Sequence, residues 1–215
     1  MVQVKICGVN SPGAMTAAVE NGADFIGLVF YPPSPRAVTP EKARDLAALA
    51  GMRVKKVGLF VDPGDGLLDR TLAAVKLDML QLHGKETTAR VAEIKKRTGL
   101  AAMKAIKVAS AADLIAADDF AAAADWLLFD GVPPSDKKNA LPGGNAAQFD
   151  WALLAGRKFT KPWMLSGGLT PGNVAQAIRI SGAPCVDVSS GVETHPGLKD
   201  LAKIAAFIRA ARGKT

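Results

Sequence analysis

The chain has 215 residues, of which 49% are hydrophobic and only 6% are aromatic, and its formal net charge is +7. That length and apolar content predict a single domain over residues 1–215 with a sizeable core. The basic residues are spread along the chain, and the densest patches, at 95–97 and 137–138, are short and lack interleaved aromatic residues. Phosphate tracking needs a concentrated basic surface, so nucleic acid is not an expected partner.

The cysteine content and the apolar pattern limit where the protein can work. Cys7 and Cys185 are too few for a disulfide framework, and neither belongs to a Cys-x-x-Cys pair. The chain opens on a strand-like run without a signal peptide, and no apolar stretch is long enough to span a bilayer. We expect a cytoplasmic protein with no membrane partner, and the sequence leaves a monomer and a homodimer both open.

Short β-rich runs alternate with helical stretches from end to end. The first strand is expected over 2–7, and Ser11 with Pro12 then begins a helix that stops at Gly22. A second strand over 25–30 is followed by a helix that begins at Thr39. Further strands are expected over 54–61, 79–82, 101–108, 126–130, 162–166 and 185–189, and further helices over 66–76, 88–98, 111–124 and about 200–212.

This alternation yields eight β-α units of about 27 residues each, a spacing typical of parallel crossovers. Strands that alternate with helices predict a parallel sheet with the helices outside it. Eight repeats favour closure of that sheet, so the predicted fold is a single (β/α)8 TIM barrel of the α/β class. The least regular segment, 131–147, follows the sixth strand and is a candidate mobile active-site loop.

Two glycine-rich turns follow the seventh and eighth strands. They are Ser166–Leu169 and Ser189–Val192, at the strand ends where barrels of this kind build their active sites. Glycine lets backbone N–H groups approach an anion closely, and adjacent turns after the last two strands are a usual phosphate site. The pair therefore predicts a small phosphorylated substrate.

Two side chains at strand ends are candidates for acid–base chemistry. Cys7 ends the first strand, where a thiolate would act as a base if positive groups lowered its pKa. Asp130 ends the sixth strand after an apolar run, and such surroundings would raise its pKa and help it hold a proton. The alternatives are a small buried thiol and a carboxylate that caps the next loop. Cys185 begins a strand and is expected in the core. With His83 and His195 as its only histidines, the chain is not expected to bind zinc.

An ordered set of motifs then resembles the phosphoribosylanthranilate isomerase family of tryptophan biosynthesis. The matching segments cover nearly the whole chain and read VKICG (4–8), NGAD (21–24), FYP (30–32), QLHG (81–84), FDW (149–151), LSGGL (165–169) and VDVSSGVE (186–193). The resemblance implies a (β/α)8 barrel and an isomerase that uses no cofactor. Its reaction is the Amadori rearrangement of N-(5′-phosphoribosyl)anthranilate to the 1-deoxyribulose derivative.

The resemblance also implies roles for single residues. Asp130 would be the general acid that opens the furanose ring, and Cys7 the general base at the second sugar carbon. Arg36 would meet the anthranilate carboxylate. The other implied substrate contacts are His83 in the anthranilate pocket, Asp187 near the substrate nitrogen, and Gly167, Gly168, Ser190 and Gly191 at the phosphate. Lys5 and Lys104 are both expected at the barrel mouth, where one of them would support the thiolate.

One position departs from the family pattern, and two other functions stay open. Gly131 stands where many members carry Thr or Ala, which puts the geometry of the following loop in doubt. The first alternative is the related histidine-pathway isomerase, which acts on a phosphoribosyl aminoaldose and uses aspartates in both roles, whereas Cys7 stands at the base position here. The second is a barrel that binds a phosphosugar without turning it over.

Overall fold

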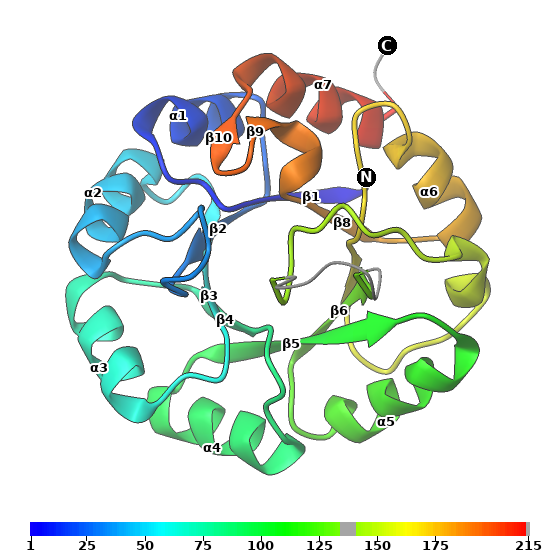
Figure 1. The fold of residues 1–215 in the computed structure, drawn as a ribbon, viewed down its shortest axis with the longest axis horizontal. Coiled ribbons are helices and arrows are strands. Elements are labelled where there is room, and N and C mark those ends of the chain that lie inside the picture. Colours follow the sequence, from blue (N-terminus) through cyan, green and yellow to red (C-terminus); the bar gives the residue numbers. More distant parts are fainter. Residues whose placement is uncertain (134–140, 214–215) are drawn as a thin grey trace.

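A computed structural model describes residues 1–133 and 141–213, and its parallel strands close into one barrel in which each strand pairs with the next and β8 pairs with β1. Figure 1 looks down this barrel, with the strands around the centre and the helices in an outer ring. The strands are β1 (Gln3–Cys7), β2 (Phe25–Val29), β3 (Lys55–Phe60), β4 (Met79–Leu82), β5 (Ala101–Val108), β6 (Trp126–Gly131), β7 (Trp163–Leu165) and β8 (Cys185–Val188). The predicted TIM barrel is confirmed.

Helix caps fall where the sequence predicts them. The Ser11 hydroxyl accepts a hydrogen bond from the Ala14 N–H at 3.3 Å, and the Thr39 hydroxyl accepts one from the Lys42 N–H at 3.2 Å. In both helices proline occupies the first turn, where no N–H is missed. The helices are α1 (Pro12–Glu20), α2 (Pro40–Ala50), α3 (Asp65–Ala74), α4 (Thr88–Thr98), α5 (Ala116–Ala121), α6 (Val174–Ser181) and α7 (Leu201–Ala211).

The helical layer departs from the prediction after β5 and after β6. The single helix expected over 111–124 is a 3-10 turn, η1 (Ala111–Ile115), followed by the short α5. The Asp113 carboxylate accepts the N–H groups of Ala109 and Ser110, which tightens that first turn. After β6 the described chain has only the 3-10 turn η2 (Trp151–Leu154) before β7.

Side-chain alternation along the strands separates two layers of core. One layer fills the barrel interior and consists of Phe25, Val57, Met79, Met103, Ala105, Leu128, Met164 and Cys185. The other layer lies between the strands and the helices, and it includes Val4 and Ile6 of β1. Because alternate residues face opposite sides, Lys5 and Cys7 of β1 point into the barrel. The confinement of Cys185 to the core agrees with the prediction.

A small hairpin follows the barrel on the same face as the strand ends. It consists of the 3-10 turn η3 (Ser190–Val192), β9 (Glu193–His195) and β10 (Leu198–Lys199), which pair in an antiparallel sheet. In Figure 1 this hairpin lies between α1 and α7, beside the barrel mouth. Within the described residues no helix is long and apolar enough to cross a membrane.

Candidate active site

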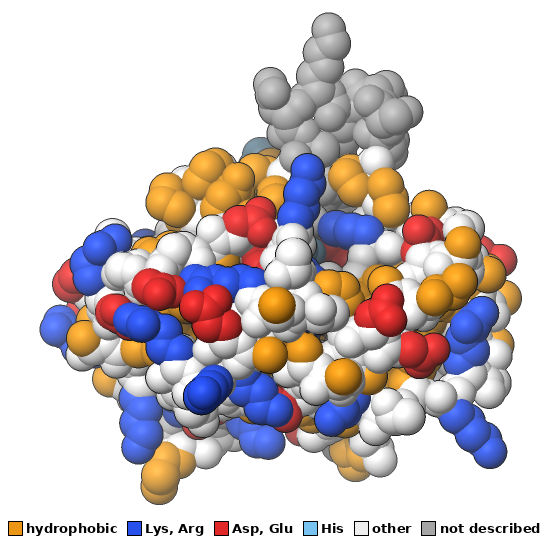
Figure 2. Space-filling view, turned by 90° about the horizontal axis from the view of Figure 1, so that it is seen from below, with side chains coloured by type: hydrophobic (Ala, Val, Ile, Leu, Met, Phe, Trp, Pro, Cys, Tyr) orange, Lys and Arg blue, Asp and Glu red, His pale blue; other side chains and the backbone are white. Residues whose placement is uncertain are grey.

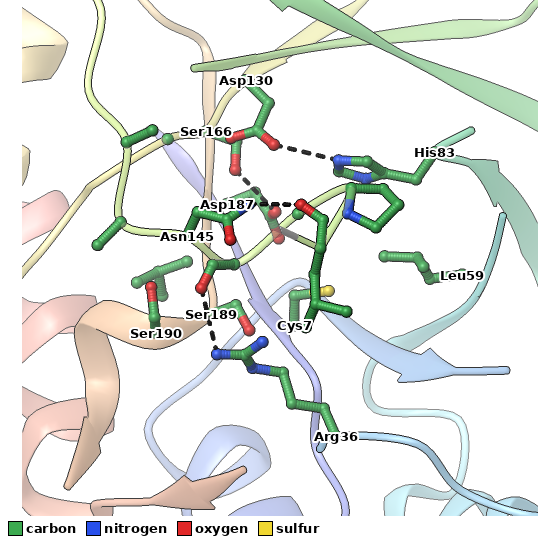
Figure 3. A pocket seen from close by; sticks show the side chains of 18 of the residues that line it. Cys7, Arg36, Leu59, His83, Asp130, Asn145, Ser166, Asp187, Ser189 and Ser190 are labelled. Carbon is green, nitrogen blue, oxygen red and sulfur yellow. Dashed lines mark hydrogen bonds and ion pairs between the residues drawn. The ribbon is translucent and has the colours of Figure 1, made fainter. Parts of the chain in front are cut away.

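A cavity opens at the C-terminal ends of the strands, as expected for this architecture. Figure 3 shows side chains from several strands converging on it. All of the predicted site residues lie in its lining: Cys7, Arg36, His83, Asp130, Gly167, Gly168, Asp187, Ser190 and Gly191. The structure thus brings together positions that are far apart in sequence, while the role of each one stays a prediction.

Cys7 lies at the cavity end of β1 with only 4% of its surface exposed. Burial raises the pKa of its thiol above the ordinary value, and the nearby ammonium groups of Lys5 and Lys199 offset only part of that rise. The positive groups that the sequence analysis named as a condition for a thiolate are present and do lower this pKa, but burial outweighs them in the ligand-free protein. A thiol in this setting is protonated at neutral pH, and it becomes a base only when its surroundings change or when a small thiolate fraction reacts.

Asp130 ends β6 across the cavity. The prediction that its pKa is raised is wrong in direction. Burial works to raise the pKa of this carboxyl. The His83 ring, with Nε2 at 3.1 Å from Oδ2, and the Lys107 ammonium, at 2.5 Å from Oδ2, outweigh burial and hold the pKa below its ordinary value. The strand end is less apolar than its own sequence suggests, because His83, just after β4, and Lys107 of β5 supply two polar partners.

Lys5 and Lys104, both expected at the barrel mouth, lie on different sides of the strands. Lys5 is fully buried, and its Nζ lies 2.8 Å from Asp187 Oδ1 and acts electrostatically on the Cys7 thiol. Lys104 points away from the cavity and pairs with Glu86 at 2.6 Å. It alternates with the interior residues Met103 and Ala105, so it must face the helices. Lys5 thus lies inside the barrel, where it acts on Cys7, but it is not among the residues that line the cavity, and the predicted position of Lys104 at the mouth is wrong.

Arg36 enters the cavity from the segment after β2 and is nearly fully buried. Its Nε and one terminal nitrogen each lie 2.8 Å from an oxygen of Glu193, a bidentate ion pair, and Lys199 Nζ lies 2.7 Å from the same carboxylate. The aliphatic stem crosses Gly8, where an added Cβ would come within 2.7 Å of Arg36 Cδ. The guanidinium is thereby held at the cavity wall in one orientation.

The two glycine-rich turns touch each other at one side of the cavity. A Cβ added to Gly191 would lie 1.8 Å from the Leu169 carbonyl oxygen, so only glycine allows this approach of the two backbones. Gly167 and Gly168 both have positive φ, at 88° and 62°. Beside them Asp187 accepts a hydrogen bond from the Ser166 hydroxyl at 3.1 Å. The turns form one continuous backbone surface along the cavity, which suits an anion of several oxygens.

The segment after β6 covers part of the cavity from above. Residues 141–147 line it, and a Cβ added to Gly143 would lie 2.9 Å from His83 Nε2. The Gly144 carbonyl oxygen lies 3.4 Å from an Arg36 nitrogen. The candidate mobile loop over 131–147 thus lies at the site in its described part. Its residues 134–140, including the lysine pair at 137–138, fall outside the described residues, and its mobility stays a prediction.

Three residues of the site are not predicted from the sequence. Lys107 lies two residues after Ala105 and four after Met103 on β5, so its side chain points to the same side of the strand as theirs, into the barrel. This alternation alone would have placed it near Asp130. Glu193 and Lys199 lie on the hairpin and meet Arg36 from far along the chain, and no local pattern marks that contact. Among the residues that the structure describes, no group of His, Cys, Asp or Glu could hold a metal ion.

Comparison with known proteins decides the family. Residues 4–210 match the family model described as N-(5′-phosphoribosyl)anthranilate (PRA) isomerase. The chain belongs to this family. It is 60% identical over 212 residues to the N-(5′-phosphoribosyl)anthranilate isomerase of Paramagnetospirillum magneticum, which covers 99% of this chain and 98% of the relative. The predicted isomerase of tryptophan biosynthesis is confirmed at this level.

Solved structures of the same family share the fold. Phosphoribosyl anthranilate isomerase from Thermotoga maritima is 36% identical, with a TM-score of 0.88 over 99% of this chain and 100% of that one. A further structure of a phosphoribosyl anthranilate isomerase holds reduced 1-(o-carboxyphenylamino)-1-deoxyribulose 5-phosphate, with a TM-score of 0.85, 36% identity and the same coverage. That protein binds a phosphorylated small molecule, the class of partner predicted for this chain.

Proposed function

We propose that this chain, acting as one isomerase domain without a cofactor, converts N-(5′-phosphoribosyl)anthranilate to 1-(2-carboxyphenylamino)-1-deoxyribulose 5-phosphate. Asp130 serves as the general acid and Cys7 as the general base. The observation that carries the proposal is the placement of these two groups around one cavity whose walls also hold Arg36 and the two glycine-rich turns. A proton donor and a proton acceptor at opposite sides of a bound sugar match an aldose-to-ketose rearrangement.

The reaction follows from what each group can exchange with the sugar. The Asp130 carboxyl gives its proton to the furanose ring oxygen, the bond from that oxygen to C1 breaks, and the anthranilate nitrogen lone pair forms a C1=N iminium. The Cys7 thiolate takes the proton from C2, and the released pair forms C1=C2 while the iminium electrons return to nitrogen. The enolamine then gains a proton at C1 and loses the one on the C2 hydroxyl, which leaves the ketone.

The phosphate belongs at the glycine-rich turns. Gly167 and Gly168 from the β7 end and Ser190 and Gly191 from the β8 end present closely spaced backbone to the cavity. Backbone N–H groups in such a concave arrangement bind an anion without a long side chain. Asp187, tied to Lys5 and Ser166, lies between these turns and Cys7 and is placed to contact the substrate nitrogen.

The anthranilate end belongs near Arg36 and His83. Arg36 presents a guanidinium that Glu193 holds in one orientation from behind, and the remaining face is suited to a carboxylate. The His83 ring lines the same cavity beside Asp130. The histidine-pathway aminoaldose is less well matched, since its isomerase uses an aspartate where this barrel has Cys7.

The test is turnover of phosphoribosylanthranilate made in situ, followed by the loss of its anthranilate fluorescence without added metal or cofactor. Wild type converts the substrate, and Cys7→Ala and Asp130→Asn each lose on the order of 10²-fold to 10⁴-fold in kcat, as expected when an acid or base is removed. Cys185→Ala is the matched control, because that thiol is equally buried but lies at the other end of the barrel.

Two results would contradict the proposal. An inactive wild type would exclude this substrate, and conversion of the histidine-pathway aminoaldose or plain phosphosugar binding would then be measured in its place. If folded Cys7→Ala and Asp130→Asn kept full activity, the proposed reaction would still be supported, but the assignment of Cys7 as base and Asp130 as acid would be wrong.

A further inference from the structure

A line of buried polar side chains crosses the barrel at the floor of the cavity. Lys5 on β1 and Gln81 on β4 are both 0% exposed, and Lys5 Nζ lies 2.8 Å from Gln81 Oε1 and 2.8 Å from Asp187 Oδ1. A buried ammonium needs acceptors on several sides, and these two oxygens supply them. Lys5 therefore joins strands on opposite sides of the barrel.

The line continues from Gln81 to the candidate acid. Gln81 Nε2 lies 2.8 Å from His83 Nδ1, and His83 Nε2 lies 3.1 Å from Asp130 Oδ2. The last of these contacts is drawn in Figure 3. Every contact in the series Asp187–Lys5–Gln81–His83–Asp130 is within hydrogen-bond distance, and all five residues are buried.

The chemistry of these groups fixes the direction of each hydrogen bond. An ammonium only donates, so it binds the carbonyl oxygen of the Gln81 amide and turns the NH₂ group toward His83. An amide nitrogen also only donates, so His83 Nδ1 has to accept and carries no proton. The ring proton then lies on Nε2 and points at the Asp130 carboxylate.

We propose that Gln81 is a positioning residue that holds His83 in the Nε2–H tautomer, with Lys5 fixing the Gln81 amide. This inference rests on the proposed role of Asp130 as the acid. His83 then donates to Asp130 Oδ2, and Oδ1, which lies beside Gly167, is the oxygen directed to the substrate. The same Lys5 acts on Cys7, so one buried residue orients the surroundings of both reacting groups.

The tautomer can be read directly, because the chain has only two histidines. The protein labelled with ¹⁵N-histidine gives two sets of ring signals, and His195→Gln identifies the set of the exposed residue. In wild type the His83 signals are expected to show a protonated Nε2 and an unprotonated Nδ1. A protonated Nδ1 in wild type overturns the proposal without any variant at position 81.

Gln81→Glu keeps the size of the side chain and the acceptor for Lys5, but it removes the donor. His83 Nδ1 is then expected to gain a proton, because a carboxylate can only accept. Unchanged His83 signals in this variant would overturn the proposal. Gln176→Glu on α6 is the matched control, since that side chain is exposed and lies far from the cavity.

Kinetics separate this inference from the proposed function. Gln81→Glu is expected to lower kcat by about tenfold to a hundredfold, the size of effect seen when the hydrogen-bond partner of a metal-bound histidine is removed, with a smaller change in KM. An inactive wild type would contradict the proposed function, and the His83 tautomer would then have no role in this reaction. An active wild type with Nδ1 protonated would leave the function standing and overturn the inference alone.

Discussion

In the ligand-free protein the proton shared by Cys7 and Asp130 lies on Cys7, whereas the proposed reaction requires it on Asp130. The pKa of Cys7 lies above its ordinary value and the pKa of Asp130 lies below, so the thiol is protonated and the carboxyl is ionised at neutral pH. The reactive form has the proton on Asp130. Both forms hold one proton between the two groups, so their ratio does not change with pH between the two pKa values.

This sets the pH profile of kcat/KM. The value of kcat/KM is expected to be level across the neutral range. It falls at acid pH, where Asp130 binds a proton while Cys7 keeps its own, so that both groups are protonated. It falls again at alkaline pH, where Cys7 loses its proton and neither group is protonated. A continuous rise in kcat/KM through neutral pH would contradict a protonated Cys7 and an ionised Asp130. A limb near pH 6 would belong to the substrate phosphate, whose second pKa is about 6.

Lys107→Met tests the acidic limb of that profile. The ammonium lies 2.5 Å from Asp130 Oδ2 and stabilises the ionised carboxylate, so its loss raises the pKa of Asp130 and moves the acidic limb to higher pH. The larger fraction of protonated Asp130 also favours the reactive form at neutral pH. Lys96→Met removes the same charge from the exposed face of α4 and is expected to leave the limb in place.

At the scale of elements, the turn between β4 and α4 is held by a buried ion pair. The Glu86 carboxylate accepts the N–H groups of Asp62 and Gly84 at 2.9 and 3.0 Å and binds Lys104 Nζ at 2.6 Å. Lys104 has only 3% of its surface exposed. The turn begins at His83, so this pair supports the segment that carries one of the partners of Asp130.

Glu86→Gln leaves the Lys104 ammonium buried without a counter-charge. We expect a loss of about 3 kcal/mol in the free energy of unfolding, measured by urea denaturation, because removal of one partner of a buried pair costs about 3–5 kcal/mol. Glu93→Gln breaks an exposed pair with Arg90 and is expected to cost less than about 1 kcal/mol. A loss below about 1 kcal/mol for Glu86→Gln would show that the pair does not hold the turn. Adding Lys104→Met to Glu86→Gln should restore much of the stability.

At the scale of the whole molecule, the charge of +7 is distributed instead of concentrated. Figure 2 shows lysine and arginine side chains interspersed with acidic ones over the visible face. Such a distribution of positive charge raises the potential around a small anion. The proposed substrate carries a phosphate and a carboxylate, so the net charge favours its approach.

Added salt should therefore act on binding more than on chemistry. Between about 10 mM and 0.3 M ionic strength the Debye length shortens from about 30 Å to well under 10 Å, and KM is expected to rise about threefold or more. The kcat at saturating substrate should stay nearly constant, because the reacting groups are buried. An unchanged KM would show that the distributed charge has no part in substrate capture.

The amino-acid sequence by itself determined the barrel and the location of its site. The eight strands, the caps at Ser11 and Thr39, and the polar or glycine residues at strand ends are local features that appear in the structure as expected, whereas the helices after β5 and β6 do not. Parity along β5 also distinguishes Lys107 from Lys104, although both are lysines of one strand.

Only the tertiary structure decided the electrostatics of the site. Gln81 lies 76 residues from Lys5, Asp187 lies 182 from it, and Glu193 lies 157 from Arg36. Asp130 follows an apolar run, yet His83 and Lys107 lower the pKa that burial at the end of its own strand would raise. Protonation depends on which charges and hydrogen bonds lie within a few ångströms, and barrel closure sets those distances between residues that no local pattern connects.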